Sequence, residues 1–353
     1  MPTATALAQA LRHAVRVLDF PSTSDHWQGG QPAVLMPSID LAVVSFVSGR
    51  KPRWANVLFS REHPQGVVAD IGADGGPVCN VQFVSDERNA LGESTPWLPG
   101  SGWSAMPWRT LHGTGPHRVV APYPASLLKL MVAVGVGLAV DAGRTAWPDA
   151  LEPMVTHSDN DATDTCVALL HRCGVVATLN QRFAALRLPT LQLNNTQASG
   201  GWRNASGAGV GQIHMTAWDT VRLLWLLDAQ APPAPWLPAS LRESTPLLQP
   251  ATRDHLRAVL ARQTLDEVLS SGRLRDVPGW VPGLPDAPAF AHKTGCTDNY
   301  ASDAGIVHTH GAHYIVAVLT SLGRRYAPHP RCATTWRLPA LGAVVHALMS
   351  QPA

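Results

Sequence analysis

The sequence has few charged residues and no long charged run. Only 15% of its 353 residues are Asp, Glu, Lys or Arg, and the formal net charge is +2. Its 27 basic residues are scattered, which is not the clustered basic patch of a nucleic-acid-binding protein. We therefore expect no nucleic-acid partner. Apolar residues make up 45% of the chain, a globular composition that buries a sizeable core.

Cysteine is also scarce. The five cysteines include no Cys-x-x-Cys pair, and their odd number and spacing exclude a disulfide scaffold. Cys166 and Cys173 lie on one face of an expected helix, and we interpret them as buried apolar residues. His308, His310 and His313 surround an expected hairpin turn, and we expect no carboxylate partner near them. We expect these histidines to face solvent rather than to bind a metal, and we expect no cofactor.

An export signal and a long apolar run are both missing from the sequence. Residues 1–20 have no cationic region followed by an apolar one, and instead predict an amphipathic helix. The most apolar run, 123–137, is too short for a membrane span and contains Lys129. As written, the chain is expected to be cytoplasmic, or periplasmic or secreted if a signal was removed. Its oligomeric state is left open.

Hydrophobic periodicity predicts strands near both ends of the chain and helices between them. The expected strands are 39–49, 289–295, 303–310 and 313–321. The expected helices are 126–140, 158–174, 216–228, 251–263 and a last one at 335–349 that Pro339 interrupts. We expect Ser158 or Asp159 to cap the second of these, and Thr216 the third. The fold class is therefore α/β, with the two chain ends meeting in one sheet.

Residues 50–115 are less regular than the rest. Short strand-like pieces alternate there with Gly, Pro and Ser clusters, and 94–115 predicts a long loop. We interpret 50–115 as a loop-rich insertion. The tryptophans of the loop, Trp97, Trp103 and Trp108, are interpreted as pinning it to the body rather than as a wall of a substrate cleft.

Ser126 and Lys129 lie one turn apart at the start of the apolar helix, so their side chains project together. The positive end of a helix and burial both lower the pKa of an amine, and a neutral lysine beside a serine is a workable base for a nucleophile. The pattern Ser-x-x-Lys alone is weak evidence. A second copy, Ser48-Gly49-Arg50-Lys51, lies in a polar turn that we interpret as a solvated loop.

Two further motifs strengthen the interpretation of Ser126 and Lys129 as a reactive pair. Ser158-Asp159-Asn160 begins an expected helix, and Lys293-Thr294-Gly295 ends an expected strand. In this order, the three motifs are those of class A β-lactamases and penicillin-binding proteins. The chain resembles that family from residue 116 onward.

The resemblance implies a β-lactamase/transpeptidase-like fold. This fold has an antiparallel sheet formed from both chain ends and flanked by helices, plus a helical lobe that carries the Ser-x-x-Lys and Ser-Asp-Asn motifs. We expect one domain over 1–353, in which 116–353 is the motif-bearing catalytic part.

The resemblance also implies a role for each motif residue. Ser126 would be the acylated nucleophile and Lys129 its base, and Ser158 would relay a proton to the leaving group. The backbone N–H groups of Ser126 and Cys296 would form the oxyanion hole.

Substrate binding would fall to the remaining motif residues. Asn160 would bind the amide side chain of the substrate and contact Lys129. Lys293 and Thr294, with Gly295 completing the motif, would hold a substrate carboxylate. The expected partner is therefore a small molecule or peptide with a carboxylate.

One part of the family pattern is missing. Class A enzymes deacylate with a glutamate from a loop after Ser-Asp-Asn, but this chain has no glutamate between Glu152 and Glu243. Asn194 or Asn195, within the corresponding segment 186–207, could match the family's asparagine. Without the glutamate, Lys129 or Ser158 would have to release the acyl group.

The interval from Ser126 to Ser158 is shorter, and that from Ser158 to Lys293 longer, than we expect for class A. The site is therefore expected to be reshaped, with 50–115 as a candidate to replace the lost cleft wall.

The expected function is a serine hydrolase that forms an acyl-enzyme on Ser126 and acts on a β-lactam, amide or ester carbonyl. One alternative is a cytoplasmic biosynthetic esterase or acyltransferase, or a DD-peptidase-like enzyme. Another is a non-catalytic sensor that binds a β-lactam or another ligand, which the missing glutamate favours. His157 and His292, which flank two motifs, are interpreted as ordinary polar residues around the site, and Tyr300 is given no catalytic role.

Overall fold

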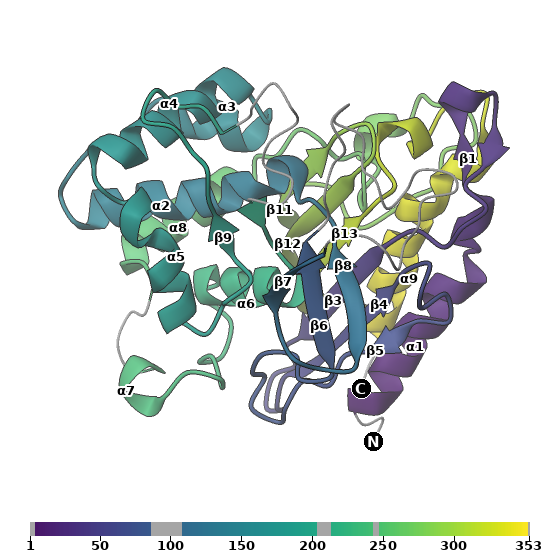
Figure 1. Cartoon of the computed structure of the whole chain (residues 1–353), viewed down its shortest axis with the longest axis horizontal. Helices are drawn as coiled ribbons and strands as arrows, with labels where there is room; N and C mark the ends of the chain where they lie inside the picture. The colour runs from purple at the N-terminus through teal and green to yellow at the C-terminus, as the bar shows by residue number, and fades with distance from the viewer. Residues whose placement is uncertain (1–3, 86–107, 203–212, 243–246, 352–353) are drawn as a thin grey trace.

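The computed structural model describes residues 4–85, 108–202, 213–242 and 247–351. Its largest sheet is antiparallel, in the order β11-β12-β13-β3-β4-β5. These strands are β3 (Ile39–Ser45), β4 (Arg53–Phe59), β5 (Val67–Val68), β11 (Phe290–Cys296), β12 (Ala301–Thr309) and β13 (Ala312–Thr320). Because β13 pairs directly with β3, the two ends of the chain meet in one sheet, as predicted (Figure 1).

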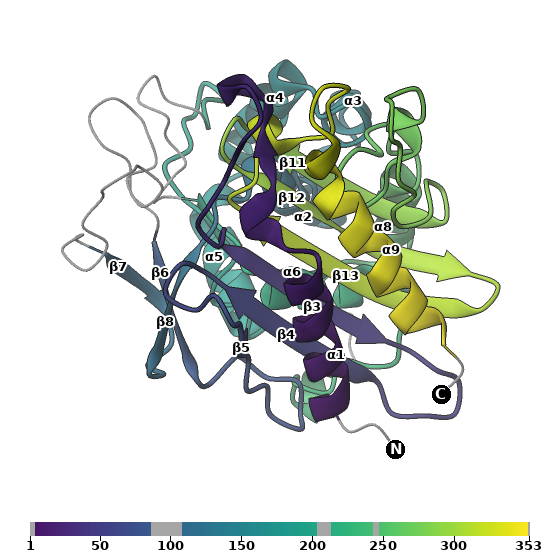
Figure 2. The same ribbon diagram turned by 90° about the vertical axis from the view of Figure 1, so that its right-hand side faces the viewer.

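The terminal helices α1 (Ala4–Val17) and α9 (Arg337–Ser350) lie side by side across one face of this sheet (Figure 2). Leu11 and Val15 of α1 are buried in one cluster with Leu341 of α9 and every second apolar side chain of β3 and β13. The prediction that Pro339 interrupts α9 is wrong. Pro339 occupies the first turn of the helix, where its missing N–H would have no helical partner anyway.

A helical lobe packs beside the sheet and covers its other face (Figure 1). Its helices are α2 (Lys129–Asp141), α3 (Leu151–Thr156), α4 (Asn160–Arg172), α5 (Val176–Ala185), α6 (Ala217–Leu227), α7 (Ala239–Arg242) and α8 (Pro250–Leu260). The central α2 is buried along nearly its whole length, as its uniformly apolar sequence predicts. A Cβ on Gly135 would lie 2.9 Å from Leu170, so the glycine lets α4 approach α2 closely.

The remaining elements are short. The two-stranded sheets pair β1 (Ser24–Asp25) with β2 (Gln31–Pro32), and β9 (Gln192–Leu193) with β10 (Ile213–His214). The 3-10 turns are η1 (Phe20–Ser22), η2 (His26–Gln28), η5 (Ala125–Leu128), η6 (Gly272–Leu274), η7 (Arg324–Tyr326) and η8 (Ala333–Trp336). None of the helices in the described ranges is long and apolar enough to cross a membrane.

The segment 50–115, which we interpret as a loop-rich insertion, contributes short strands to two sheets. Its first part contributes β4 and β5 to the main sheet. A second sheet, ordered β7-β6-β8, consists of β6 (Val81–Ser85), β7 (Arg109–His112) and β8 (His117–Ala121), and its last strand lies beyond the segment. Trp97 and Trp103 lie outside the described residues. Trp108 is half-buried, with the Arg118 guanidinium 5.8 Å from its ring.

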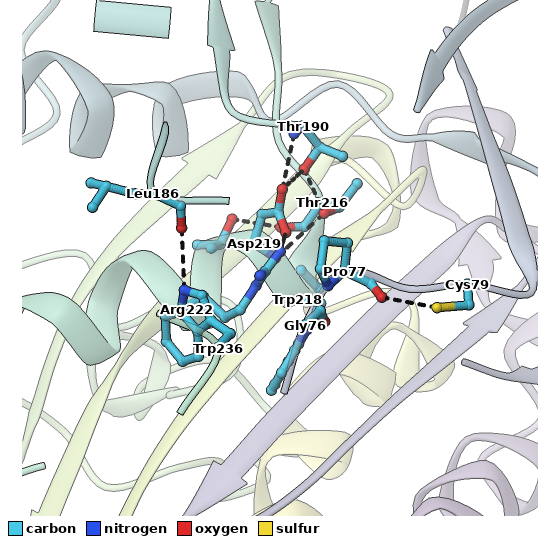
Figure 3. Close-up of polar contacts among 12 residues, drawn as sticks. Gly76, Pro77, Cys79, Leu186, Thr190, Thr216, Trp218, Asp219, Arg222 and Trp236 are labelled. Carbon is cyan, nitrogen blue, oxygen red and sulfur yellow. Dashed lines mark hydrogen bonds and ion pairs between the residues drawn. The ribbon is translucent and has the colours of Figure 1, made fainter. Parts of the chain in front are cut away.

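A buried ionic network fixes α6 within the lobe (Figure 3). Thr216 caps the helix, as predicted, and the Asp219 carboxylate accepts hydrogen bonds from Thr190 N and Oγ1 at 2.9 and 2.6 Å. The same carboxylate pairs with Arg222, whose side chain is fully buried between Trp218 and Trp236. Asp219 is the one acceptor that the described part of the chain offers this guanidinium.

Replacing Asp219 with Ala is therefore expected to lower the free energy of unfolding by about 3–5 kcal/mol, because it leaves the buried Arg222 without a counter-charge. Urea denaturation checks the value. Adding Arg222→Leu to Asp219→Ala should restore part of the loss. Glu152→Gln, which breaks an exposed pair with Arg262, should leave the midpoint unchanged. Equal midpoints for Asp219→Ala and Glu152→Gln would contradict the assignment.

Candidate active site

The turn η5 carries Ser126 into a cleft between the helical lobe and the sheet. Ala125, just before it, has a left-handed backbone with φ of 50°. Gly295 of β11 packs directly on this turn, because a Cβ there would lie 2.5 Å from Pro124 O and 2.6 Å from Leu127 N. Only glycine permits this approach. The packing brings the Lys-Thr-Gly motif beside Ser126, although the two are far apart in the sequence.

The second Ser-x-x-Lys copy behaves differently. Ser48 to Lys51 are exposed in the turn between β3 and β4, which confirms the interpretation of a solvated loop.

Lys129, the first residue of α2, is fully buried and reaches the Ser-Asp-Asn motif. Its Nζ donates to Ser158 O at 2.6 Å, to Ser158 Oγ at 3.2 Å and to Asn160 Oδ1 at 2.9 Å, and lies 3.3 Å from Asp159 O. The Trp202 ring centre is 5.6 Å from the same nitrogen, within the range of a cation–π contact. The predicted contact between Asn160 and Lys129 is therefore present.

Ser158 lies between α3 and α4 in a left-handed conformation, with φ of 57°. For a residue other than glycine this conformation costs about 1–3 kcal/mol and persists only where the surroundings enforce it. The neighbouring Asp159 caps α4 by accepting a hydrogen bond from Ala162 N at 2.9 Å. Because Asp159 supplies the cap, the Ser158 hydroxyl stays available to the lysines.

Lys293 reaches Ser158 from the sheet. Its Nζ donates to Ser158 Oγ at 3.0 Å and to Thr294 O at 2.6 Å. Burial lowers the pKa of Lys293 to about 7, although the negative charge of Asp303 nearby acts in the opposite direction. Two buried lysines from different elements thus converge on one hydroxyl.

The cleft has a volume of about 680 Å³ and collects most of the predicted site residues. Its lining includes Ser126, Ser158, Asn160, Thr294, Gly295 and Cys296. Burial raises the pKa of the Cys296 thiol to about 12, so the thiol is protonated at neutral pH and the residue is not a thiolate nucleophile. Tyr300, which the sequence left without a role, is buried and packs edge-on against Tyr123.

Sequence reasoning missed several residues that line the cleft: Tyr123, Trp202, Glu267, Arg273 and Arg324. Glu267 pairs with Arg273 at 3.7 Å. Both come from the connection between α8 and β11, and no motif or spacing points to them. Asn194, one candidate for the family's asparagine, accepts a hydrogen bond from Asn180 Nδ2 of α5 at 2.7 Å.

The outcomes for the histidines and cysteines are mixed. The expectation that no carboxylate lies near the hairpin histidines is wrong, because His313 Nε2 lies 2.6 Å from Asp228 Oδ2. Among the described residues no group of three or more His, Cys, Asp or Glu could hold a metal ion. Cys166 is buried as predicted, whereas Cys173 is half-buried.

A family model described as "Beta-lactamase enzyme family" matches residues 135–334. No curated protein matches the chain.

Several solved structures share the fold. The chain is similar to a beta-lactamase from Sphaerobacter thermophilus, with 14% identity, 98% of this chain and 99% of that chain covered, and a TM-score of 0.50. A class A beta-lactamase from Bacteroides cellulosilyticus gives 14% identity, 99% coverage of both chains and a TM-score of 0.51. A beta-lactamase from Streptosporangium roseum gives 14% identity, with 96% of this chain and 98% of that chain covered, and a TM-score of 0.50. These likenesses confirm the predicted β-lactamase/transpeptidase-like fold.

The burial of Lys293 predicts a pH-dependent stability difference. Burial lowers the pKa of Lys293 in the folded protein from its ordinary value of 10.5 to about 7. Between these values the unfolded chain binds more protons, so Lys293 makes the wild type gain stability as pH rises. We expect the free energy of unfolding of Lys293→Met, relative to that of wild type, to be highest near pH 6. This difference should fall toward pH 10 by up to about 1.4 kcal/mol per pH unit.

Urea denaturation of both proteins at several pH values measures this difference. Other titrating groups are common to the two proteins and largely cancel. A difference that does not change with pH would contradict the assignment of a buried lysine with a lowered pKa.

Proposed function

The chain belongs to the beta-lactamase enzyme family, and we propose that it is a serine hydrolase that forms an acyl-enzyme on Ser126. The observation that carries the proposal is the convergence of Lys129 and Lys293 on Ser158 Oγ, at 3.2 and 3.0 Å. Ser126 and Ser158 line the same cleft, and the two buried amines lie behind it, within hydrogen-bond distance of Ser158 Oγ.

In the proposed acylation step, Ser126 Oγ attacks the substrate carbonyl carbon and its proton passes to Lys129. The carbonyl oxygen becomes negatively charged and is stabilised by the backbone N–H groups of Ser126 and Cys296. As the bond to the leaving group breaks, Ser158 Oγ gives its proton to the departing nitrogen or oxygen. Ser158 regains a proton from either lysine, since the Nζ of each lies within hydrogen-bond distance of its oxygen.

The proposed substrate carries a carboxylate near the scissile β-lactam, amide or ester carbonyl. Thr294, next to the buried Lys293 in the sequence, and the exposed Arg324 line the cleft. These groups favour an anionic ligand. Asn160 would receive the substrate's amide side chain while its Oδ1 accepts from Lys129 at 2.9 Å.

The candidate functions differ in how, and whether, the acyl group leaves Ser126. Segment 186–207 contains no glutamate, so the class A route of deacylation has no base there. We propose that Lys129 or Ser158 activates the water, or a second acceptor, that attacks the ester on Ser126. Esterase, acyltransferase or DD-peptidase-like activity would use the same step. The missing glutamate also favours a second candidate, a sensor that stays acylated.

We expect benzylpenicillin to form a covalent adduct with the protein, which intact-mass spectrometry detects over time. Ser126→Ala should abolish the adduct because it removes the nucleophile. Ser158→Ala should slow its formation by about 100- to 10,000-fold, because the leaving group then departs without a positioned proton donor.

A matched control is available in the second Ser-x-x-Lys copy. Ser48→Ala should leave the adduct unchanged, because Ser48 is exposed in a surface turn. An adduct that disappears with time supports a hydrolase, and a permanent one supports the sensor. If neither penicillin nor a general serine-acylating probe forms an adduct, the proposed function is wrong.

A further inference from the structure

His292, which precedes Lys293 in β11, is a buried histidine held between two carboxylates. Its Nδ1 lies 2.7 Å from Asp303 Oδ1, and its Nε2 lies 3.2 Å from Asp266 Oδ1. The side chains of His292 and Asp303 are fully buried, and that of Asp266 is 13% exposed. Burial opposes a charge on the ring, but the two carboxylates outweigh it and raise the pKa of His292 to about 9. The ring is therefore an imidazolium at neutral pH.

The two carboxylates belong to different parts of the molecule. Asp303 lies in β12, where it pairs in register with Thr294 of the Lys-Thr-Gly motif. Asp266 lies in the connection between α8 and β11. The imidazolium thus ties this connection to the sheet, and Leu269 N adds a hydrogen bond of 3.0 Å to the other oxygen of Asp303.

The same connection is tied to the helical lobe. Gln263, which is buried, donates from Nε2 to Val155 O of α3 at 3.0 Å and lies 3.3 Å from His292 O. Thr264 Oγ1 donates to Thr156 O at 2.8 Å. Residues 263–269 therefore bridge the strand that carries Lys293 and the helix that leads to Ser158.

This bridge also forms part of the cleft wall. Leu265 and Glu267, on either side of Asp266, both line the cleft. Neighbouring side chains of a strand point to opposite faces, so His292 and Lys293 extend in opposite directions from β11. Without the imidazolium, the two carboxylates would repel each other and push the wall away from the sheet.

We propose that His292 is a positioning residue. Its ion pairs with Asp303 and Asp266, here called the clamp, hold Lys293 and the cleft wall at Leu265 and Glu267 at the spacing that a carboxylate-bearing substrate requires. The inference rests on the proposed function, because it concerns how that cleft recognises its substrate. His292 acts through Lys293 and the wall and does not itself touch the substrate.

Two acylating probes test this role, benzylpenicillin, which carries a carboxylate, and p-nitrophenyl acetate, which does not. The measured quantity is the ratio of their second-order acylation rate constants. Asp266→Ala removes the outer half of the clamp and should lower the ratio by about 10- to 100-fold, as expected for a misplaced binding group. His292→Gln should lower it in the same direction. Asp266→Asn, which keeps an oxygen for His292 Nε2, should restore most of it.

His313→Gln is the matched control, since it breaks another His–Asp pair, with Asp228, at the far end of the sheet. It should lower the melting temperature and leave the ratio unchanged, because loss of folded protein affects both probes equally. If neither probe acylates the wild type, the proposed function fails. If both do and Asp266→Ala keeps the wild-type ratio, the positioning role of His292 is wrong. Should His292→Gln not fold, Asp266→Ala still decides the question.

Discussion

The convergence of two buried lysines on the Ser158 hydroxyl is the constraint on which the rest of the site depends. An ammonium group withdrawn from water is strongly unfavourable unless polar partners replace its hydration. Lys129 meets this requirement with oxygens of Ser158 and Asn160, and Lys293 with Ser158 Oγ and Thr294 O. The start of α2, the α3–α4 junction and β11 must therefore meet at one point, which is where the cleft lies.

The surrounding packing makes this meeting rigid. Gly295 lets β11 lie directly on the turn that carries Ser126, and Gly135 lets α4 lie close to the buried α2. Ala125 and Ser158 both hold left-handed conformations at the cleft, and such strain persists only in well-determined surroundings. The apolar run behind Ser126 and Lys129 thus serves as the scaffold that keeps both side chains in place.

Local patterns in the sequence predicted much of this arrangement. The cap at Thr216, the uniformly apolar α2 and the strands at both chain ends follow from short-range periodicity and capping chemistry. The three motifs converge as their resemblance to the family implied. Partnerships across long intervals could not be predicted, because they depend on topology. Asp228 meets His313, and Asp266 meets His292, only once α6 and the α8–β11 connection pack against the sheet. The prediction that Pro339 interrupts the last helix was wrong because the effect of a proline depends on where the helix begins.

The central claim is that Ser126, and not another nucleophile of the cleft, receives the acyl group. The most direct measurement is to label the protein with a fluorescent penicillin, digest it with protease and locate the adduct by tandem mass spectrometry. We predict a single labelled peptide with the modification on Ser126. An adduct on Ser158 or Cys296, with Ser126 unmodified, would contradict the assignment of Lys129 and Ser158 as base and proton relay.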